Sequence, residues 1–465
     1  MKTKLLTGLC LYLLLMSCAS THKNNGYYAI HSGVAWFDQY KNEVNAHGAC
    51  IVREGDKYYL FGEYKSDTTN AFAGFGCYSS TDLMNWQFEK VVLPVQPEGL
   101  LGPSRVGERV KVMKCPSTGE FVMYMHTDDM KYMDPHVGFA TCSTINGDYQ
   151  FHGSLLHEGE YIHKWDLGTY QDNDGKGYLL THEGCIYELT NDYKSVARIV
   201  VANEARGGES PAMFKKNGVY FWLFSNKTSW ERNDNYYLTS NSLEGPWDRR
   251  GYFAPEGTLT WNSQCSFVLP VVNGSDTLHM YMGDRWSYPK QASAGTQVWL
   301  PITVKGNEMS LPEYYASWQP DASKKEGWSP VETKVNSIKN KAVKVKDNWE
   351  LKDGVYQSNE QGAMLSYTFH GRQIGITALM NTTSGYANVT IRNSKGEEVI
   401  RTIVDFYSNY ECTSQNFLSP VLEPDEYTLT IEVLGEHPKW SDKRRNDYGS
   451  TDNYIRIADV LEYKI

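Results

Sequence analysis

Apolar and polar residues alternate in a unit that recurs five times along the N-terminal part of the chain. Each unit is an apolar strand, a polar turn with Gly, Asn or Asp, and a second strand rich in Tyr, Phe or Trp. The five units are residues 48–65, 108–127, 167–182, 210–227 and 265–286. Alternation with a period of two on both sides of such a turn predicts a β-hairpin. A third strand-like segment with a polar bend follows each hairpin, so each unit predicts one small antiparallel sheet.

Spaced copies of a sheet-forming unit are typical of propellers and arrays. Five copies predict a five-bladed β-propeller, which we expect over residues 27–312, followed over residues 313–330 by a linker or a segment that wraps around the propeller. From about residue 331 the pattern changes to short alternating segments separated by turns. This spacing predicts a C-terminal, jelly-roll-like β-sandwich over residues 331–465. Helical periodicity is nearly absent, so the predicted fold class is all-β.

The N-terminus has the pattern of a bacterial export signal. Lys2 and Lys4 precede an apolar stretch over residues 5–16 that is too short to span a bilayer. The sequence LMSC at residues 15–18 is typical of a lipobox, in which Cys18 is acylated. We therefore expect a lipoprotein signal peptide over residues 1–18 and a polar tether over residues 19–26. The predicted product is an exported bacterial lipoprotein, periplasmic or at the cell surface, anchored to the membrane at Cys18.

Composition narrows the classes of partner. The 33 Tyr and 13 Trp residues favour β-structure, and flat rings of this kind also stack on sugars. The net charge is −10 and the only basic run is Lys443–Arg445, which argues against a nucleic-acid partner. Seven cysteines follow Cys18, mostly within strand patterns and without zinc-site spacing, so we expect most of them to be small buried side chains and expect no metal site. One disulfide is the alternative in an exported protein. We expect a monomer.

Polar residues stand at equivalent positions of successive units. Four hairpins are entered through Glu108, Asp166, Glu209 and Gln264, and the first hairpin ends at Glu63. Equivalent positions of propeller blades meet at the mouth of the central channel, so we expect these side chains to gather there. Any one of them alone is explained equally well as a cap of a strand end. The set as a whole favours a functional ring.

A ring of acids among tryptophans fits the chemistry of glycoside hydrolysis. One carboxylic acid protonates the leaving oxygen while a second group activates water, and a neighbouring carboxylate raises the pKa of the acid. Carboxylates also bind Ca²⁺, but no calcium-loop spacing supports that interpretation, and no cofactor is expected. The tryptophans near the ring are Trp36, Trp165, Trp230, Trp261 and Trp286. Of these, we expect Trp230 and Trp286 to form walls of a sugar site.

Two segments resemble motifs of glycoside hydrolase family 43, a family of five-bladed propellers that hydrolyse glycosides with inversion. Residues 165–180 (WDLGTYQDNDGKGYLL) resemble its third-blade motif, and residues 208–225 (GESPAMFKKNGVYFWLFS) resemble its fourth-blade motif. The resemblance implies that Glu209 is the general acid and that Asp166 tunes its pKa. Most of the family supplies the general base from an Ala-Asp-Pro in the first blade, where this chain has Ala46-His47-Gly48.

The exo-β-1,3-galactanase subgroup of that family shows the same loss. Its motifs resemble residues 46–48, 62–63, 108–112, 125–126, 263–264 and 283–286 of this chain. The resemblance implies that Gln264 positions or activates the attacking water, through its imidic tautomer in the second case. The expected substrate-binding residues are Glu63, Glu108, His47, His126, Trp230, Arg285 and Trp286.

Three questions stay open on the sequence alone. An amide is a weak base, so Glu63 or Glu108 is a rival for activating the water, with Gln264 only orienting it. His47 is a further candidate base, although a buried structural histidine is the simpler interpretation. In the C-terminal domain, Trp440, Tyr448 and Tyr454 suit either sugar stacking or packing against the propeller.

The function predicted from these residues is an inverting, exo-acting hydrolase that releases galactose from β-1,3-galactan. Two alternatives remain. One is an α-L-arabinofuranosidase or β-galactofuranosidase on the same scaffold. The other is a glycan-binding lipoprotein without catalysis, against which the joint presence of Glu209 and Asp166 argues.

Overall fold

The computed structural model describes residues 26–463 other than 274–275, 332–334 and 338–342. Within these ranges the protein is almost entirely β-strand, as predicted, and the only helical segments are η1 (Gly99–Leu101) and the short turn α1 (Leu259–Asn262). None of the helices described is long and apolar enough to cross a membrane. The predicted signal peptide with Cys18, and the tether as far as residue 25, lie outside the described residues.

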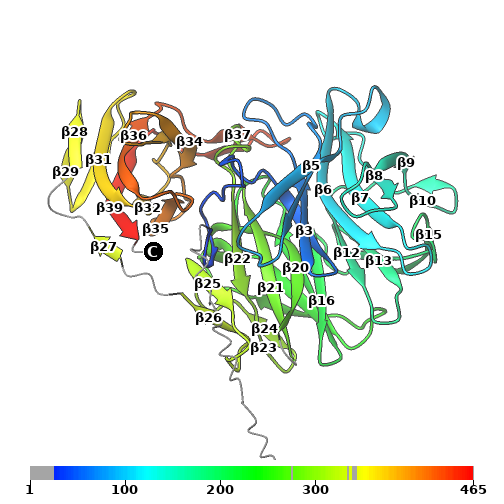
Figure 1. Ribbon diagram of the computed structural model, residues 1–465. Helices are drawn as coiled ribbons and strands as arrows, with labels where there is room; N and C mark the ends of the chain where they lie inside the picture. Colours follow the sequence, from blue (N-terminus) through cyan, green and yellow to red (C-terminus); the bar gives the residue numbers. More distant parts are fainter. Residues whose placement is uncertain (1–25, 274–275, 332–334, 338–342, 464–465) are drawn as a thin grey trace, which may run out of the picture.

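Five sheets follow one another along the first part of the chain (Figure 1), and all their strand pairs are antiparallel except one at the edge of the third sheet. The first sheet consists of β2 (His47–Glu54), β3 (Lys57–Glu63), β4 (Phe75–Ser80) and β5 (Gln87–Leu93). The second consists of β6 (Arg105–Lys114), β7 (Phe121–Asp129), β8 (His136–Cys142) and β9 (Gln150–Ser154). The third consists of β12 (Leu167–Gln171), β13 (Gly177–Thr181), β14 (Cys185–Leu189) and β15 (Val196–Val201), extended at its edge by β10 (Leu156–His157), which is parallel to β15, and by β11 (Glu160–Tyr161). The fourth consists of β16 (Gly208–Lys216), β17 (Val219–Asn226), β18 (Tyr236–Ser240) and β19 (Asp248–Tyr252). The fifth has the three strands β20 (Gln264–Asn273), β21 (Asp276–Arg285) and β22 (Thr296–Pro301).

These five sheets form a closed ring. The first strand of each sheet contacts the first strand of the next: β2 meets β6, β6 meets β12, β12 meets β16, β16 meets β20, and β20 returns to β2. The inner strands are buried on both faces, as in β7, where all residues except the last are buried. The outer strands face water, as in β19, which has no buried residue. The residues that begin the first strands therefore converge on the centre of the ring.

The segment expected to be a linker or a wrap is part of this structure. Residues within 313–330 form β25 (Ser317–Pro320) and β26 (Trp328–Pro330), and β25 pairs with β1 (Ile30–His31) near the N-terminus. Trp318 is fully buried and its indole N–H donates to the carbonyl of Trp299 in β22, at 2.7 Å. Of the two alternatives for this segment, these contacts favour the wrap, because such a large apolar side chain packs against the fifth sheet instead of staying in water. A separate hairpin of β23 (Thr303–Lys305) and β24 (Glu308–Ser310) precedes this segment.

The last part of the chain forms two further antiparallel sheets. One contains β29 (Glu350–Lys352), β30 (Val355–Ser358), β39 (Ile455–Tyr463), β32 (Gln373–Met380) and β35 (Cys412–Leu418), with β27 (Val335–Ser337) also paired to β39. The other contains β28 (Val343–Lys346), β31 (Met364–Gly371), β36 (Asp425–Val433), β33 (Tyr386–Arg392) and β34 (Glu398–Asp405). In β36 every second residue from Tyr427 to Val433 is buried, so one face of the strand meets a core and the other meets water. A small hairpin, β37 (Lys439–Ser441) and β38 (Asp447–Gly449), stands apart from both sheets.

The two groups of sheets pack on one another through apolar and polar contacts. Phe37 of the first part meets Phe417 of the second edge to face, with ring centroids 6.5 Å apart. The Ser287 hydroxyl donates to Asp405 Oδ2 at 2.9 Å, and the Tyr407 hydroxyl donates to Glu231 Oε2 at 2.6 Å. The second group therefore lies against loops that leave the ring of five sheets.

The seven cysteines of the described residues are free thiols, and five of them are buried. They pack as small apolar side chains.

Candidate active site

Strand register brings pairs of polar residues to the centre of the ring. In each of the five sheets the first two strands form a hairpin that opens toward the centre of the ring. At this open end, in four of the five sheets, a polar residue near the start of the first strand stands opposite a polar residue near the end of the second strand. These pairs are His47 with Glu63, Glu108 with His126, Glu209 with Ser225, and Gln264 with Asp284. In the third sheet, Asp166 directly precedes β12, and its carbonyl accepts the backbone N–H of His182 at 2.9 Å. The ring of polar residues therefore includes residues from the second strand of each of these hairpins as well as from the first.

Local backbone strain re-aims these side chains. A β-bulge interrupts the pairing of the first, second and fourth hairpins, and a residue with positive φ lies in each: Gly48 (φ 57), Arg109 (φ 56) and Ser210 (φ 55). Bulges occur next to active sites because they redirect a side chain. At Gly48 any other residue would displace the Glu63 carboxylate, since a Cβ atom would lie 2.1 Å from Glu63 Oε1. Arg109 and Ser210 hold an unfavourable conformation, which costs about 1–3 kcal/mol each and needs support from their surroundings.

The guanidinium of Arg109 lies at the centre of the ring and is 5% exposed. It donates to Gln264 Oε1 at 2.5 Å and lies 3.5 Å from Asp166 Oδ1 and 3.7 Å from Asp284 Oδ2. The backbone N–H of the same residue donates to Glu63 Oε1 at 2.8 Å. One residue of the second sheet thus contacts ring residues of the first, third and fifth sheets.

The amide of Gln264 has all of its hydrogen-bonding positions filled. Its oxygen accepts from Arg109 and from the indole N–H of Trp286 at 2.9 Å, and its nitrogen donates to Glu209 Oε1 at 3.0 Å and to Ser225 Oγ at 2.9 Å. Two donors at the oxygen favour the ordinary amide, because the imidic tautomer carries a proton on that oxygen. The side chain is therefore fixed in direct contact with Glu209.

Glu209 has the environment of a proton donor. Its side chain is partly exposed, and burial raises its pKa well above the ordinary value, with a further contribution from the negative charge of Asp166. Asp166 itself is 8% exposed, and its Oδ2 accepts from the backbone N–H of Ser210 at 3.0 Å and from the Ser210 hydroxyl at 2.8 Å. Asp166 is thus held by hydrogen bonds while its neighbour Glu209 favours the protonated form.

Glu108 sits in a cluster of cations and hydroxyl groups. Its Oε1 accepts from the Tyr132 hydroxyl at 2.8 Å and from Asn70 Nδ2 at 3.0 Å, and lies 3.5 Å from Lys65 Nζ. Burial alone would raise the pKa of Glu108, but Lys65 and His126 outweigh it and hold that pKa well below the usual range. Burial likewise opposes the charge on His126, whereas hydrogen bonds to Asp128 and Glu108 raise its pKa to about 9. The cluster is therefore an ionised, tightly held network.

Two more carboxylates lie beside Gly48. Glu63 is 1% exposed, and its Oε2 lies 2.7 Å from Lys65 Nζ. Asp284 is also 1% exposed, and its Oδ1 accepts the backbone N–H of Gly48 at 3.1 Å. Burial raises the pKa of Asp284 to about 6, although the charge of Arg109 opposes that shift. Glu63 therefore belongs to the first hairpin and Asp284 lies against it, beside His47 at the start of β2.

His47 and Trp286 are buried parts of the ring. The His47 ring is 1% exposed, and burial, together with the charge of Lys65, lowers its pKa to about 3, so it is neutral. It lies 5.8 Å from the ring of Trp286. Arg109 in turn lies 5.3 Å from the Trp286 ring centroid, a cation–π contact. Trp286 thus packs between a histidine and an arginine while it holds Gln264.

Arg285 and Trp230, both expected to bind substrate, make contacts with other parts of the protein. The Arg285 guanidinium donates to the backbone carbonyls of Asn262 at 3.0 Å and Trp261 at 3.1 Å. These carbonyls belong to α1, a turn in which all four residues have positive φ, at a cost of about 1–2 kcal/mol per residue. Arg285 therefore supports the strained turn that leads into Gln264. Trp230 stacks on Tyr288, with ring centroids 4.6 Å apart, near the contact with the second group of sheets.

Sequence patterns assigned no role to several residues that complete the ring. Arg109, Asp284 and Ser225 lie inside motif segments that gave them no role, and His182 lies just beyond such a segment. The hairpin register is the signal that finds three of them, because it places each opposite a predicted ring residue or its neighbour. Within the described ranges, no group of three or more His, Cys, Asp or Glu side chains is arranged to hold a metal ion.

A family model and several solved structures are similar to this chain. The model of glycosyl hydrolases family 43 matches residues 42–258. A proposed exo-β-1,3-galactanase from Bifidobacterium bifidum s17 is 34% identical with a TM-score of 0.57, and the match covers 60% of this chain and 95% of that one. The exo-β-1,3-galactanase of Phanerochaete chrysosporium, solved with galactose, is 26% identical with a TM-score of 0.68, covering 93% and 99%. An exo-β-1,3-galactanase from Clostridium thermocellum is 26% identical with a TM-score of 0.59, covering 84% and 100%. No curated protein matches the chain.

The central position of Arg109 predicts a pH-dependent loss of stability in Arg109→Gln. At pH 7 the buried carboxylates lose their cation, and we expect the free energy of unfolding to fall by about 3–5 kcal/mol. Below pH 6 the difference from the wild type should shrink, because Asp284 becomes protonated and no longer needs the cation. Urea unfolding at pH 7 and pH 4.5 measures both values. Arg206→Gln, at an exposed arginine, is the control, and a loss that does not change with pH would contradict this account.

Proposed function

The chain belongs to glycosyl hydrolase family 43, and we propose that it is an inverting, exo-acting enzyme that releases galactose from β-1,3-galactan chains. The observation that carries this proposal is the placement of Glu209: partly exposed, beside Asp166, and favouring its protonated form. The similarity of the chain, over most of its length, to exo-β-1,3-galactanases supports the choice of sugar and linkage. A protein that only binds glycans has no use for a carboxylic acid with a raised pKa.

We assign the five sheets as the blades of a five-bladed β-propeller and the last two sheets as a β-sandwich. The closed ring of inner strands and the equivalent positions of the ring residues support the propeller. The alternating burial of strands such as β36 supports two sheets packed face to face. The substrate site then lies at the mouth of the propeller channel.

Glu209 donates the proton to the oxygen that leaves the galactosyl unit. Asp166, held in place by Ser210, keeps Glu209 protonated by like-charge repulsion. The hydrogen bond from Gln264 Nε2 orients the Glu209 carboxyl. Bond cleavage consumes the proton of Glu209, and the proton of the attacking water goes to a base on the opposite face of the sugar.

We propose Glu63 as that base. An inverting pair needs about 6.5–9.5 Å between its two groups, whereas Gln264 is in contact with Glu209 at 3.0 Å. Glu63 stands opposite His47, in the first blade, where the family's usual aspartate is replaced. Glu108 is a weaker base because Lys65 and His126 hold its pKa so low. Gln264 then orients the acid through its hydrogen bond to Glu209 and takes no proton.

We propose that Glu108, His126 and Trp286 grip the terminal galactose, with the ammonium of Lys65 between Glu63 and Glu108. His47 and Arg285 support this site from within the protein, since His47 packs against the ring of Trp286 and Arg285 bonds to backbone carbonyls. We also propose an oligomeric state and a location for the enzyme. It is a monomeric exported lipoprotein, anchored in a bacterial membrane through Cys18, that acts on oligo- or polysaccharides at the periplasmic side or cell surface.

The general acid is tested by Glu209→Gln. We expect kcat on β-1,3-galacto-oligosaccharides to fall by about 10²–10⁴-fold, because the leaving sugar oxygen needs a proton. An aryl β-galactoside whose phenol leaves without protonation should lose much less. Proton NMR of the wild-type reaction should show α-galactose first, as inversion requires. Full activity of the variant on the oligosaccharide would remove Glu209 from this role.

Asp166→Asn tests the electrostatic control of the acid. Removing the charge of Asp166 lowers the pKa of Glu209, so the acid loses its proton at lower pH and the alkaline limb of kcat/KM moves to lower pH. Asp148→Asn, at an exposed aspartate paired with Lys90, is the control and should leave the profile unchanged. An unmoved alkaline limb in Asp166→Asn would show that this charge does not tune Glu209.

The base is identified by comparing Glu63→Gln with Gln264→Ala. A carboxylate base produces an acid limb in the profile of kcat/KM against pH, because the base must be ionised, whereas an amide produces none. We expect the acid limb to disappear in Glu63→Gln together with most of the activity, and to persist in Gln264→Ala. Retained activity in Glu63→Gln with complete loss in Gln264→Ala would assign the water to the amide.

A further inference from the structure

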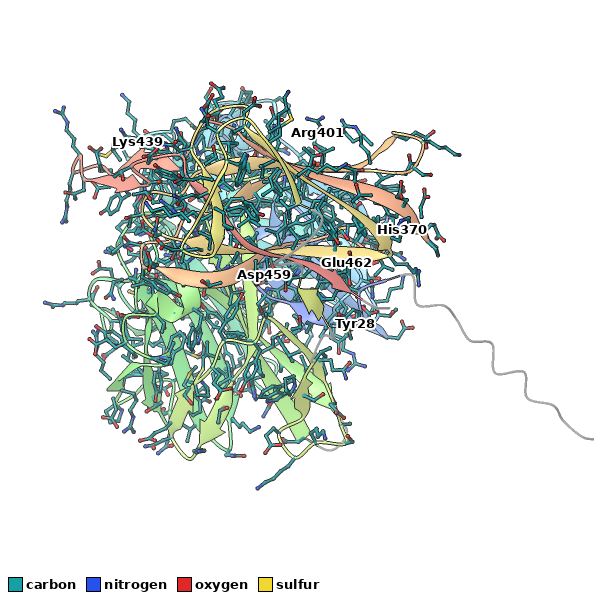
Figure 2. All side chains as sticks on the ribbon, turned by 90° about the vertical axis from the view of Figure 1, so that its left-hand side faces the viewer. Tyr28, His370, Arg401, Lys439, Asp459 and Glu462 are labelled. Atoms are coloured by element: carbon teal, nitrogen blue, oxygen red, sulfur yellow. The ribbon has the colours of Figure 1, made fainter. Side chains whose placement is uncertain are left out.

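A hairpin of the second group of sheets reaches the loops around the site. Figure 1 shows β37 extending from the second group toward the ring of five sheets. Lys439, at the start of this hairpin, lies at the side of the second group opposite to His370 (Figure 2). The backbone N–H of Lys439 donates to the carbonyl of Tyr288 at 3.3 Å. Tyr288 belongs to the loop that follows Asp284 and Trp286.

The tip of this hairpin has a fixed shape. Asp442 Oδ1 accepts the backbone N–H groups of Arg444 at 2.8 Å and Asn446 at 2.9 Å, and its Oδ2 accepts the Tyr448 hydroxyl at 3.2 Å. The rings of Trp440 and Tyr448 stack with centroids 5.8 Å apart. The side chain of Lys443 is therefore presented from a rigid turn and not from a loose loop.

Lys443 is connected to the pocket through one residue. Its ammonium donates to the backbone carbonyl of Tyr132 and lies 5.5 Å from the centroid of the same ring. The Tyr132 hydroxyl donates to Glu108 Oε1 at 2.8 Å. Tyr132 has a positive φ of 56°, which a tyrosine adopts only with support from its surroundings. The hairpin supplies such support from outside the propeller.

Another contact reaches a third loop of the site. Trp440 lies against Trp230, with ring centroids 6.4 Å apart, and Trp230 stacks on Tyr288. Trp230 belongs to the loop that follows Ser225, the partner of Glu209 in the ring. The hairpin thus touches the loops that follow His126, Ser225 and Asp284. Trp440 and Tyr448, which suited either sugar stacking or packing, pack here.

We propose that the β37–β38 hairpin completes the substrate site and that Lys443 is a positioning residue, acting through Tyr132 on Glu108. This inference rests on the proposed function, in which Glu108 grips the terminal galactose. Among the described residues, no hydrogen bond, ion pair or ring contact joins the hairpin to Glu209, Asp166 or Gln264, so its effect falls on substrate affinity and not on proton transfer. The second domain then contributes to binding at the catalytic pocket itself, independently of any sugar site of its own.

Lys443→Met tests this inference. It keeps the length and the apolar stem of the side chain and removes the ammonium. We expect KM for β-1,3-galactotriose to rise about 3–10-fold with kcat within about 2-fold of the wild type, as for an interaction lost equally from the ground and transition states. Lys443→Arg should restore most of the affinity. The matched control is Arg444→Met, since the next residue of the same turn is exposed and contacts Asp442 through its backbone N–H.

The coupling to Tyr132 is tested by a double-mutant cycle. Tyr132→Phe removes the hydrogen bond to Glu108 and keeps the ring. If Lys443 acts through Tyr132, the double variant should raise KM no more than the larger single change. Independent effects that multiply would overturn the proposed route, and an unchanged KM in Lys443→Met would overturn the proposal. Galactose binding by calorimetry to Glu209→Gln, with and without Lys443→Met, separates this result from a failure of the hydrolase assignment. Absence of hydrolysis by the wild type would overturn that assignment alone.

Discussion

A buried guanidinium surrounded by acids organises this protein's centre. Arg109 contacts Glu63 through its backbone and Asp166, Gln264 and Asp284 through its side chain, so four of the five sheets meet at one residue. A buried cation gains little net stability from its partners, because its desolvation cost offsets their attraction. Its effect is to fix positions. Glu209 stands outside this set of direct partners and is bonded to the amide of Gln264. Burial, together with the charge of Asp166, raises the pKa of Glu209 and favours its protonated form.

The same constraint explains the strain around the ring. Three of the inner hairpins contain a bulge with a left-handed residue, and the turn before Gln264 has four such residues in succession. Each departs from the conformation that its sequence prefers locally. Their neighbours support them: Glu63 bonds the backbone of Arg109, Asp166 bonds that of Ser210, and Arg285 bonds the carbonyls of α1. The cost of a strained backbone is met by polar contacts that also set the geometry of the site.

Sequence patterns predicted the repeated hairpins and the residues at their entrances. They missed the residues whose roles come from contacts between strands or between sheets. Alternation around five turns predicted the hairpins, and alignment of the units predicted Glu108, Asp166, Glu209 and Gln264 at one level, because period-two patterns are local. Asp284 and Ser225 follow only from hairpin register, and Arg109 only from the contacts between sheets. Residues 313–330 looked irregular because β25 and β26 are short and β25 pairs with β1, which lies far away in the sequence. The bond between Gln264 and Glu209 is likewise a contact between sheets.

Gly48 links the absence of an Ala-Asp-Pro in the first blade to the position of Glu63. Its φ of 57° lies outside the range open to proline, and the space where a Cβ would stand is filled by Glu63 Oε1. An Ala-Asp-Pro in this hairpin and the present placement of Glu63 are therefore mutually exclusive. Reintroducing the proline would force Glu63 out of its present position. Of the two single changes between these forms, His47→Asp keeps Gly48 and the space for Glu63, whereas Gly48→Pro displaces Glu63 while the first blade still lacks its aspartate. A path that keeps a carboxylate in place at every step therefore passes through the aspartate first.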